Sequence, residues 1–181
     1  MTHLHPRLTT YEDGALSTVG DRSVIRFERH LNHPVERVWR AISDPDEIVA
    51  WLAVADLDLV PGGRAELRWL NTDQGGEHAI ARGVVTAVDP PHLLELDTDR
   101  HGRIRWELRP SGNDGNACLL TFTASVALPT ELRLIVLAGW HTHLDFLAGA
   151  LDGDAIDWPN WPRNHWEMVH DHYVETLGQD A

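Results

Sequence analysis

Residues 34–52 combine two short helical patterns separated by a proline, and this segment restricts the fold more than any other. Apolar residues recur at the i, i+3, i+4, i+7 spacing of a helix with one buried face: Val35, Val38, Trp39 and Ile42. Pro34 suits the first position of that helix. Asp44-Pro45-Asp46-Glu47 predicts a second helix, with Asp44 as its N-cap. Ile48, Trp51 and Leu52 continue its apolar face. Two short helices directly after a strand are an uncommon arrangement.

The segments on either side of these helices show the two-residue period of half-buried antiparallel strands. Before them, residues 16–19 and 24–31 predict a hairpin around Gly20-Asp21. After them, apolar and polar residues alternate through 65–69, 103–109 and 118–126. Turn sequences lie between these runs: Pro61-Gly62-Gly63, Asp89-Pro90-Pro91, His101-Gly102 and Gly112-Asn113-Asp114-Gly115. The spacing predicts a meander without a crossover helix.

The C-terminal third changes to helical spacing. Residues 130–151 predict one helix about 30 Å long, at about 1.5 Å per residue, ending before Gly153. Residues 152–181 hold seven acidic residues and three tryptophans. Within them we expect a helix from Pro162 or Asn164 to about Leu177, packed back on the domain. The predicted organisation is a flexible arm at 1–13, one domain at 14–151 and an acidic, tryptophan-rich extension at 152–181.

Composition excludes several classes of function. The net charge of −13 argues against nonspecific binding to nucleic acid or anionic membranes. All 15 basic residues are arginine, which removes Schiff-base chemistry. Cys118 is the single cysteine, so no internal disulfide forms. We see no signal peptide, and the apolar stretch Leu132–Trp140 is too short to span a bilayer. We therefore expect a soluble cytoplasmic protein, with monomer and homodimer both open.

The order of these elements, together with particular residues, resembles the helix-grip fold of the START-like (SRPBCC) superfamily. It is most similar to the bacterial branch related to the activator of the 90-kDa heat-shock-protein ATPase. The resemblance covers about residues 14–151. The matching pieces are Pro34 through Pro45 with Trp51, Gly62-Gly63-Arg64, Val84 through Pro91, Leu93-Leu94, Trp106-Glu107-Leu108 with the Gly115 turn, Leu120-Thr121-Phe122, and Ala138 through His141 with Leu144-Asp145 and Leu147.

The resemblance implies an α+β fold in which a curved antiparallel sheet wraps a long C-terminal helix, often around an apolar cavity. Relatives range from lipid and polyketide binders through aromatases and cyclases to co-chaperones, so the fold does not determine the function. One departure concerns the strand after Leu93, where relatives often keep an aromatic residue. Here that strand continues Glu95-Leu96-Asp97, which is acidic.

Several aromatic and apolar residues are candidates for the lining of such a cavity. Pockets for small molecules combine apolar walls with few polar groups. Ordinary core packing explains the same pattern, and the sequence leaves both interpretations open. We expect Trp39 and Trp51 to belong to the core alone. The candidate ligand-binding residues are Trp69, Trp106, Phe122, Leu137, Trp140, His143 and Leu144.

Four charged or reactive residues are further candidates for ligand binding or catalysis: Arg29, Cys118, His141 and Asp145. Arg29 falls at an inward strand position, where it would bind either an internal acid or a ligand carboxylate. His141 and Asp145 are four residues apart, as in a general-base pair, but we favour a solvent-facing contact. Cys118 is expected to be an inert core thiol.

The chain's twelve histidines suggest a metal site, but their spacing does not support one. His141 and His143 point to different helix faces, as do His170 and His172. His165 and His172 can share a face but lack a third ligand. We therefore predict neither a metal nor a cofactor.

Three functions remain open from the sequence. The first is noncatalytic binding of a small hydrophobic or aromatic ligand between the sheet and the 130–151 helix. The second is a cyclase, aromatase or hydrolase that uses the same cavity, with His141 or His143 as acid or base. The third is a protein-interaction module, such as a chaperone-regulating ATPase activator.

Overall fold

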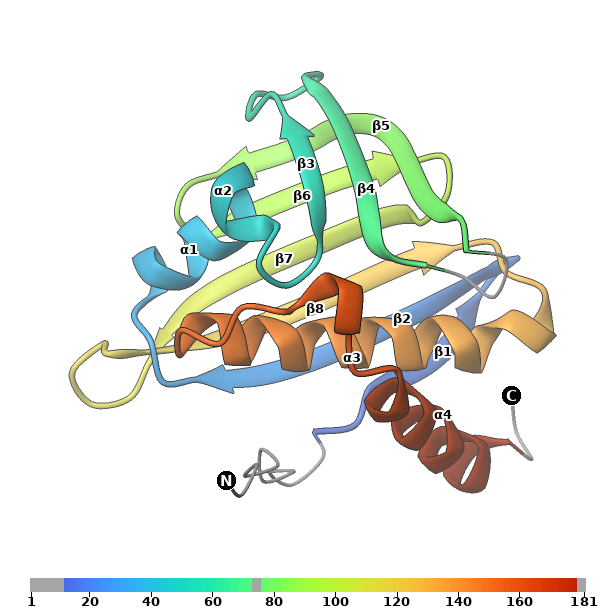
Figure 1. Ribbon diagram of the computed structural model, residues 1–181. Coiled ribbons are helices and arrows are strands. Elements are labelled where there is room, and N and C mark those ends of the chain that lie inside the picture. The colour runs from blue at the N-terminus through green and yellow to red at the C-terminus, as the bar shows by residue number, and fades with distance from the viewer. Residues whose placement is uncertain (1–11, 73–75, 179–181) are drawn as a thin grey trace.

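One antiparallel sheet of eight strands curves around a long helix in the computed structural model, which describes residues 12–72 and 76–178 (Figure 1). The strand order is β1-β2-β8-β7-β6-β5-β4-β3, so the N-terminal hairpin joins the last strand of the meander. The strands are β1 Ala15–Val19, β2 Arg22–Leu31, β3 Ala53–Leu57, β4 Arg64–Thr72, β5 His78–Asp89, β6 Leu93–Thr98, β7 Gly102–Ser111 and β8 Ala117–Val126. This architecture is the predicted α+β helix-grip fold.

The alternation in sequence becomes the two faces of the sheet. Inward side chains of β7 and β8 are buried, and Trp106 pairs with Phe122, which in turn pairs with Phe27 on β2. Cys118 is buried at the end of the same inward row, and burial raises the pKa of its thiol to about 11. The predicted core position of Cys118 is therefore confirmed.

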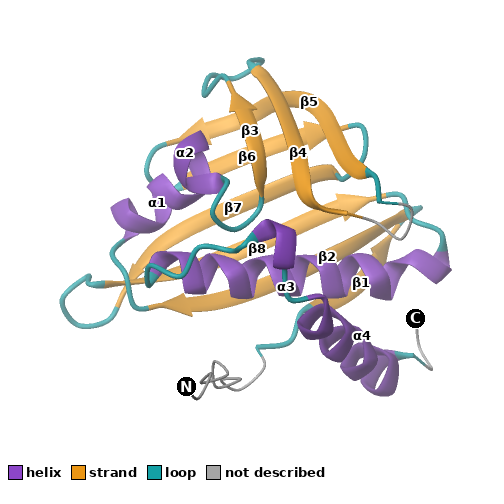
Figure 2. Cartoon of the chain, in the orientation of Figure 1, coloured by secondary structure: helices purple, strands orange, loops and turns teal. Residues whose placement is uncertain are grey.

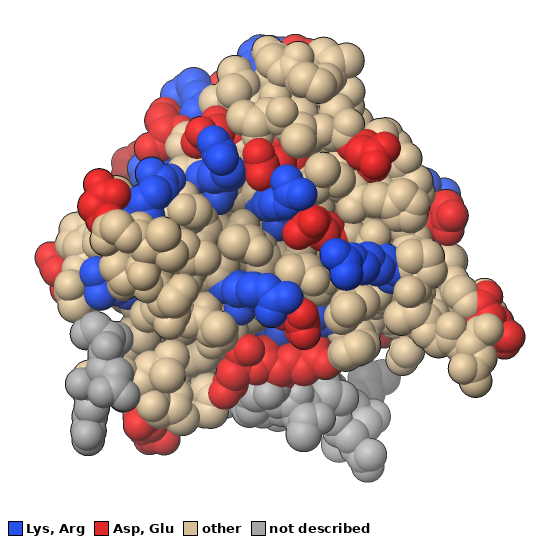
Figure 3. Space-filling model, turned by 180° about the vertical axis from the view of Figure 1, so that it is seen from behind, with Lys and Arg blue, Asp and Glu red and all other residues tan. Residues whose placement is uncertain are grey.

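The outer face of the sheet carries arginines paired with acids on neighbouring strands (Figure 3). Arg105 on β7 donates to Glu95 on β6 at 3.0 Å, and Arg82 on β5 donates to Glu66 on β4 at 3.0 Å. Burial alone would raise the pKa of Glu95, but hydrogen bonds from Thr86 and Arg105 outweigh it, so the pKa is lowered. Each exposed ion pair contributes at most about 1 kcal/mol to the folding stability. These pairs therefore add little to the stability of the sheet.

Helices α1 (Val35–Ser43) and α2 (Pro45–Ile48) follow β2 as predicted. Asp44 is the N-cap of α2 and accepts from the Asp46 N–H at 3.0 Å. Pro34 is the N-cap of α1 and not its first helical residue, a shift of one position. Glu47 does not complete a capping box in the observed contacts, because its carboxylate pairs with Arg37 and Arg40 on α1.

The two tryptophans near these helices differ in burial. Trp51 is fully buried, and its indole N–H donates to the Ala41 carbonyl at 2.8 Å. Trp39 is only partly buried against the core. The expectation that both are core residues therefore holds fully for Trp51.

Helix α3 (Arg133–Leu151), preceded by the 3-10 turn η1 (Thr130–Leu132), lies across the concave face of the sheet (Figure 2). Helix α4 (Arg163–Leu177) packs against its other side, after the 3-10 turn η2 (Trp158–Asn160). Its bounds agree with the prediction, since it follows Pro162 and ends before Gly178.

The span Thr130–Leu151 is long and apolar enough to cross a membrane by length and composition. Its length and composition therefore differ from the expectation that Leu132–Trp140 with its flanks is too short and too interrupted to span a bilayer. However, more than half of the span is buried between the sheet and the C-terminal extension, as in the core helix of a soluble fold. We assign α3 to that role.

Candidate functional site

Five rings on the concave side of the sheet form a cluster that we call the aromatic box. They come from four strands or turns and one helix: Trp69 on β4, His101 in the β6–β7 turn, Trp106 on β7, Phe122 on β8 and Trp140 on α3. The inward phase of each strand directs its ring to this place. The sequence predicted four of the five members, and His101 was missed because it lies in a turn.

Trp140 is the centre of the aromatic box. Its ring centroid lies 4.5 Å from that of Phe122, 5.8 Å from that of His101, 6.4 Å from that of Trp69 and 6.5 Å from that of Trp106. Most of these pairs are tilted or edge-to-face, which are favourable aromatic geometries. The long helix therefore presents one indole to rings from β4, β7, β8 and the β6–β7 turn.

Two polar atoms of the aromatic box are buried and have no hydrogen-bond partner among residues 12–72 and 76–178. They are the indole Nε1 of Trp106 and the imidazole Nε2 of His101. Burial lowers the pKa of His101 to about 4, helped by the nearby positive charge of Arg100, so the ring is neutral at pH 7. A buried donor without a partner costs about 1–3 kcal/mol, which makes these atoms exceptional in an otherwise apolar cluster.

The other three candidate lining residues are buried around the aromatic box. Leu137 lies on a different flank of α3, beside Gly14 and Phe27. Leu144 is fully buried in the core. His143 lies at the edge, 6.5 Å from Trp140 between ring centroids, and its Nδ1 is 3.0 Å from the Trp51 carbonyl oxygen. Burial lowers the pKa of His143 to about 4.

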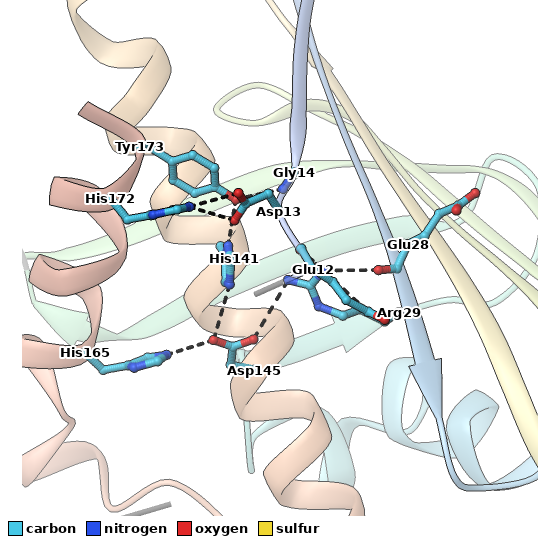
Figure 4. A network of polar contacts seen from close by, with 10 residues as sticks. All are labelled: Glu12, Asp13, Gly14, Glu28, Arg29, His141, Asp145, His165, His172 and Tyr173. Atoms are coloured by element: carbon cyan, nitrogen blue, oxygen red, sulfur yellow. Dashed lines mark hydrogen bonds and ion pairs between the residues drawn. The ribbon is translucent and has the colours of Figure 1, made fainter. Parts of the chain in front are cut away.

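The opposite side of α3 carries a connected set of polar side chains that we call the polar network: Glu12, Asp13, Arg29, His141, Asp145, His165, His172 and Tyr173 (Figure 4). Its members come from the segment before β1, from β2, from α3 and from α4. The sequence indicated Arg29 and the His141–Asp145 pair, but it gave no sign that Tyr173, His165 and His172 of α4 join them.

His141 and Tyr173 form the buried centre of the polar network. The Tyr173 hydroxyl accepts from the Gly14 N–H at 2.8 Å and lies 2.7 Å from His141 Nδ1. Burial lowers the pKa of His141 to about 4, against the opposing charge of Asp145, and burial also raises the pKa of Tyr173. A neutral His141 that accepts from the tyrosine hydroxyl fits both shifts.

Asp145 connects His141, in the centre of the polar network, to His165 and Arg29. Its carboxylate lies 2.8 Å from His165 Nε2, 3.5 Å from His141 Nε2 and 3.8 Å from an Arg29 nitrogen. The favoured solvent-facing interpretation of the His141–Asp145 contact is therefore wrong for His141, whose exposed fraction is only 2%. The reason is that α4 covers this side of α3.

Arg29 is buried, as its strand position predicted. It binds the Glu12 backbone carbonyl and lies within ion-pair distance of the Glu12 and Asp145 carboxylates. Burial lowers its pKa, and Asp145 and Glu12 oppose that shift. The sequence left open whether Arg29 binds an internal acid or a ligand carboxylate, and the structure shows internal acids, Glu12 and Asp145. Residues 12 and 13 are thus held by contacts, while the remainder of the predicted arm, 1–11, lies outside the described residues.

The histidines do not converge on one point. His165 contacts Asp145 whereas His172 contacts Asp13 at 2.9 Å, so the two histidines that can share a face serve different acids. Within residues 12–72 and 76–178, no group of three or more His, Cys, Asp or Glu side chains is arranged to hold a metal ion.

The segment after α3 returns to the domain, as the tryptophans predicted. The Ile156 N–H donates to the Ala50 carbonyl at 2.9 Å, and the Trp158 indole donates to the Val49 carbonyl at 2.7 Å. The Trp158 ring lies 6.2 Å from that of His143 between centroids. The extension therefore covers the edge of the aromatic box at His143.

The curved sheet that grips a long C-terminal helix defines the class of the protein as a START-like, SRPBCC fold. Residues 32–152 match the family described as Activator of Hsp90 ATPase homolog 1-like protein. Because the match covers more than half of the chain, the protein belongs to that family.

Solved structures share the fold at low sequence identity. CalU16 from Micromonospora echinospora is 22% identical with a TM-score of 0.67, over 98% of this chain and 100% of that one. The conserved protein of unknown function EF2215 from Enterococcus faecalis is 20% identical with a TM-score of 0.66, over 92% and 91%. A Bordetella parapertussis protein, encoded by BPP1335, is 26% identical with a TM-score of 0.65, over 96% and 90%. No curated protein matches the chain.

Proposed function

We propose that this protein binds a small hydrophobic or aromatic molecule, without catalysis, between the sheet and α3 at the aromatic box. The observation that carries the proposal is the pair of buried, unpartnered nitrogens of Trp106 and His101 within an apolar cluster. Small-molecule sites have this composition, with aromatic walls and a few polar atoms that orient the ligand. Apolar burial would supply the affinity, at about 25 cal/mol per Å².

An enzyme that uses the same place has less support. His141 contacts Tyr173 and Asp145 in the polar network, and its pKa of about 4 makes it a weak base at pH 7. His143 has a similarly low pKa and contacts a backbone carbonyl. A general base works best with a pKa near the operating pH. The two candidate histidines therefore fit structural roles better than acid–base roles.

A protein-interaction role, as an ATPase activator-like module, is supported by the family description. The outer sheet face carries many charged side chains, but its arginines are mostly paired with acids on adjacent strands. Binding hot spots usually combine buried aromatic or arginine anchors with a desolvated centre. We therefore rank this role second. We also propose a cytoplasmic location, in keeping with the single free cysteine.

Native mass spectrometry of the purified full-length protein tests the binding proposal. We expect a stoichiometric adduct, either as purified or after incubation with a pool of lipids and polyphenols, that denaturing extraction releases. Phe122→Leu should weaken its retention because Phe122 lies under Trp140. The matched variant Phe146→Leu, on the side of α3 that faces Trp158 and His165, should retain it. A clean apo mass under all conditions would contradict ligand binding and favour the interaction role.

A further inference from the structure

Strand β2 has a free edge along its second half. Its first five residues, 22–26, pair with β1, and this pairing ends where Ala15 faces Arg26. On its other side, β2 pairs with β8 as far as Leu31. Among residues 12–72 and 76–178, no strand continues β1 along residues 27–31. At 3.4 Å per residue, about 17 Å of sheet edge is therefore open.

This edge is open because α4 holds the segment that precedes β1. The Gly14 N–H donates to the Tyr173 hydroxyl at 2.8 Å, and the Asp13 carboxylate lies 2.9 Å from His172 Nε2 (Figure 4). These contacts turn residues 12–14 towards α4. They therefore do not extend β1 along the second half of β2.

Two residues of the free edge direct their backbone groups towards it. Strands β1 and β2 join through a two-residue turn, and such a hairpin closes on a hydrogen-bonded pair, here Val19 and Arg22. Backbone bonds to β1 then alternate along β2, so Glu28 and His30 face the open edge. The Glu28 carbonyl already accepts from the Arg29 guanidinium at 3.1 Å. Within the described part of the chain, the Glu28 N–H and both backbone groups of His30 are left for a further strand.

A hollow of about 280 Å³ lies along this edge and has an acidic lining. The side chains of Glu12, Asp13 and Glu28 expose 42%, 44% and 47% of their surface, so a partner can reach them. The one arginine of the lining, Arg26, is already paired with Glu28 at 2.6 Å. Charge complementarity therefore favours a cationic side chain in the hollow. The complete lining is Glu12, Asp13, Ala15, Arg26, Glu28 and His30.

We propose that an extended segment of another protein, with arginine or lysine at alternate positions, adds to the sheet beside Glu28 and His30 of β2. Backbone hydrogen bonds align the segment, and alternate side chains enter the hollow because they share one face of a strand. A second copy of this chain is disfavoured as the occupant, since its net charge is −13. The contact is short, so the complex is weak and transient. This inference goes beyond the proposed function and concerns a different surface.

Three six-residue peptides test the inference by NMR titration of the isotope-labelled, full-length protein. The first is acetyl-Thr-Arg-Val-Arg-Val-Thr-amide. The second has glutamate in place of each arginine, and the third is the arginine peptide with its four central amides N-methylated. We expect the arginine peptide to shift the amide signals of Glu28 and His30. The glutamate peptide should bind about five- to tenfold more weakly, and the methylated peptide should cause no shift, because it cannot pair as a strand.

Two matched glutamate variants test the hollow itself. Glu28 and Glu107 each pair with an arginine two residues earlier on the same strand, Arg26 and Arg105. We expect Glu28→Gln to weaken the arginine peptide about threefold, and Glu107→Gln, on β7, to leave its binding unchanged. His30→Pro removes an edge N–H at a position where a sheet edge tolerates proline, and should abolish the shifts. If thermal unfolding shows that His30→Pro does not fold, the glutamate pair and the methylated peptide decide.

Several results would overturn the inference. They are an absence of shifts at Glu28 and His30 with the arginine peptide, equal binding of the methylated peptide, and tighter binding of the glutamate peptide. Slow exchange of these two amides in the protein alone also overturns it. Slow exchange at every protein concentration assigns the edge to residues 1–11 of the same chain, and slow exchange only at high concentration assigns it to a second copy. The adduct expected at the aromatic box is measured separately, so failure of one proposal leaves the other standing.

Discussion

The two sides of α3 use polar atoms in different ways, although Trp140 and His141 are neighbours in sequence. On the sheet side, Trp140 packs into the aromatic box, where two nitrogens have no partner. On the α4 side, His141 enters the polar network, where its Nδ1 meets the Tyr173 hydroxyl and its Nε2 approaches Asp145. One helix thus separates a connected set of polar side chains from an aromatic cluster with two unpartnered nitrogens, although Arg29 Nη2 in the polar network also lacks a hydrogen-bond partner within the described residues.

The difference assigns separate roles to the two regions. Connected buried hydrogen bonds stabilise one arrangement of the chain, and here they join the start of β1, β2, α3 and α4. A buried polar atom without a hydrogen-bond partner costs about 1–3 kcal/mol. We therefore expect changes in the polar network to alter stability, and changes in the aromatic box to alter binding.

Lowering the pH from 7 to 5 should have the largest effect on stability. Burial lowers the pKa of His101, His141 and His143 to about 4, whereas an unfolded histidine has a pKa of about 6.5. The unfolded chain therefore binds more protons between these values, and stability is complete above pH 6.5 and falls towards pH 4. We expect a loss of about 5 kcal/mol by pH 5, measured by urea denaturation.

Two asparagine variants locate that pH dependence. His141→Asn keeps an acceptor near Tyr173 and should reduce the slope of stability against pH by about a third. His78→Asn replaces an exposed histidine on β5 and should leave the slope unchanged. A wild-type protein equally stable at pH 7 and pH 5 would show that the native state accepts these protons.

Asp145→Ala should destabilise the protein by about 2–3 kcal/mol at pH 7, because it removes the carboxylate that contacts Arg29, His141 and His165 and leaves Arg29 with Glu12 as its remaining acid. The cation left behind is Arg29, with a side-chain exposed fraction of only 8%. The matched control is Asp152→Ala, since Asp152 pairs with His33 at an exposed position. It should cost less than about 1 kcal/mol. Equal midpoints for the two variants in urea would contradict the importance of the network.

Tyr173→Phe should cost about 2 kcal/mol, because it leaves the Gly14 N–H without its buried acceptor. Amide hydrogen exchange gives a local measurement of the same loss. We expect faster exchange at Gly14, with little change at amides in the centre of β7. Unchanged protection at Gly14 would show that water replaces the tyrosine hydroxyl.

The smallest expected effect is the difference in stability between two variants that each lose one buried indole. Trp51→Phe removes a donor that has an acceptor, and Trp106→Phe removes one that has none. The two substitutions delete the same atoms from residues that are both at least 98% buried. We expect Trp51→Phe to cost about 1–2 kcal/mol more than Trp106→Phe in thermal or urea unfolding. An equal cost would indicate that Trp106 has a bound water as partner.

The extension after α3 also limits how the protein can be tested. Truncation at Gly153 would remove Trp158, His165 and Tyr173, which contact α2–β3, Asp145 and Gly14. Loss of a function in such a variant would therefore not separate a partner site from a folding defect. The single substitutions above reduce that problem because each changes one side chain and leaves the extension in place.

Sequence patterns predicted most of the fold because those patterns are local. The two-residue alternation of β7 and β8 determines which side chains point inward, and Asp44-Pro45 determines where α2 begins. Four aromatic members of the box followed from the same alternation and from the helical spacing of Trp140. The limits of α4 followed from its flanking proline and glycine.

The tertiary structure decided what the spacing of residues leaves open. Periodicity along α3 marks one apolar face, but the packing of α4 buries the second face and with it His141. The partners of Arg29 and Tyr173 are separated from them by up to 159 residues, so no local pattern records them. Whether the Trp106 N–H finds an acceptor depends on the meeting of β4, β7, β8 and α3. The sequence by itself therefore determined the elements and their inward faces, and only folding determined which buried polar atoms are satisfied, because that depends on contacts between distant segments.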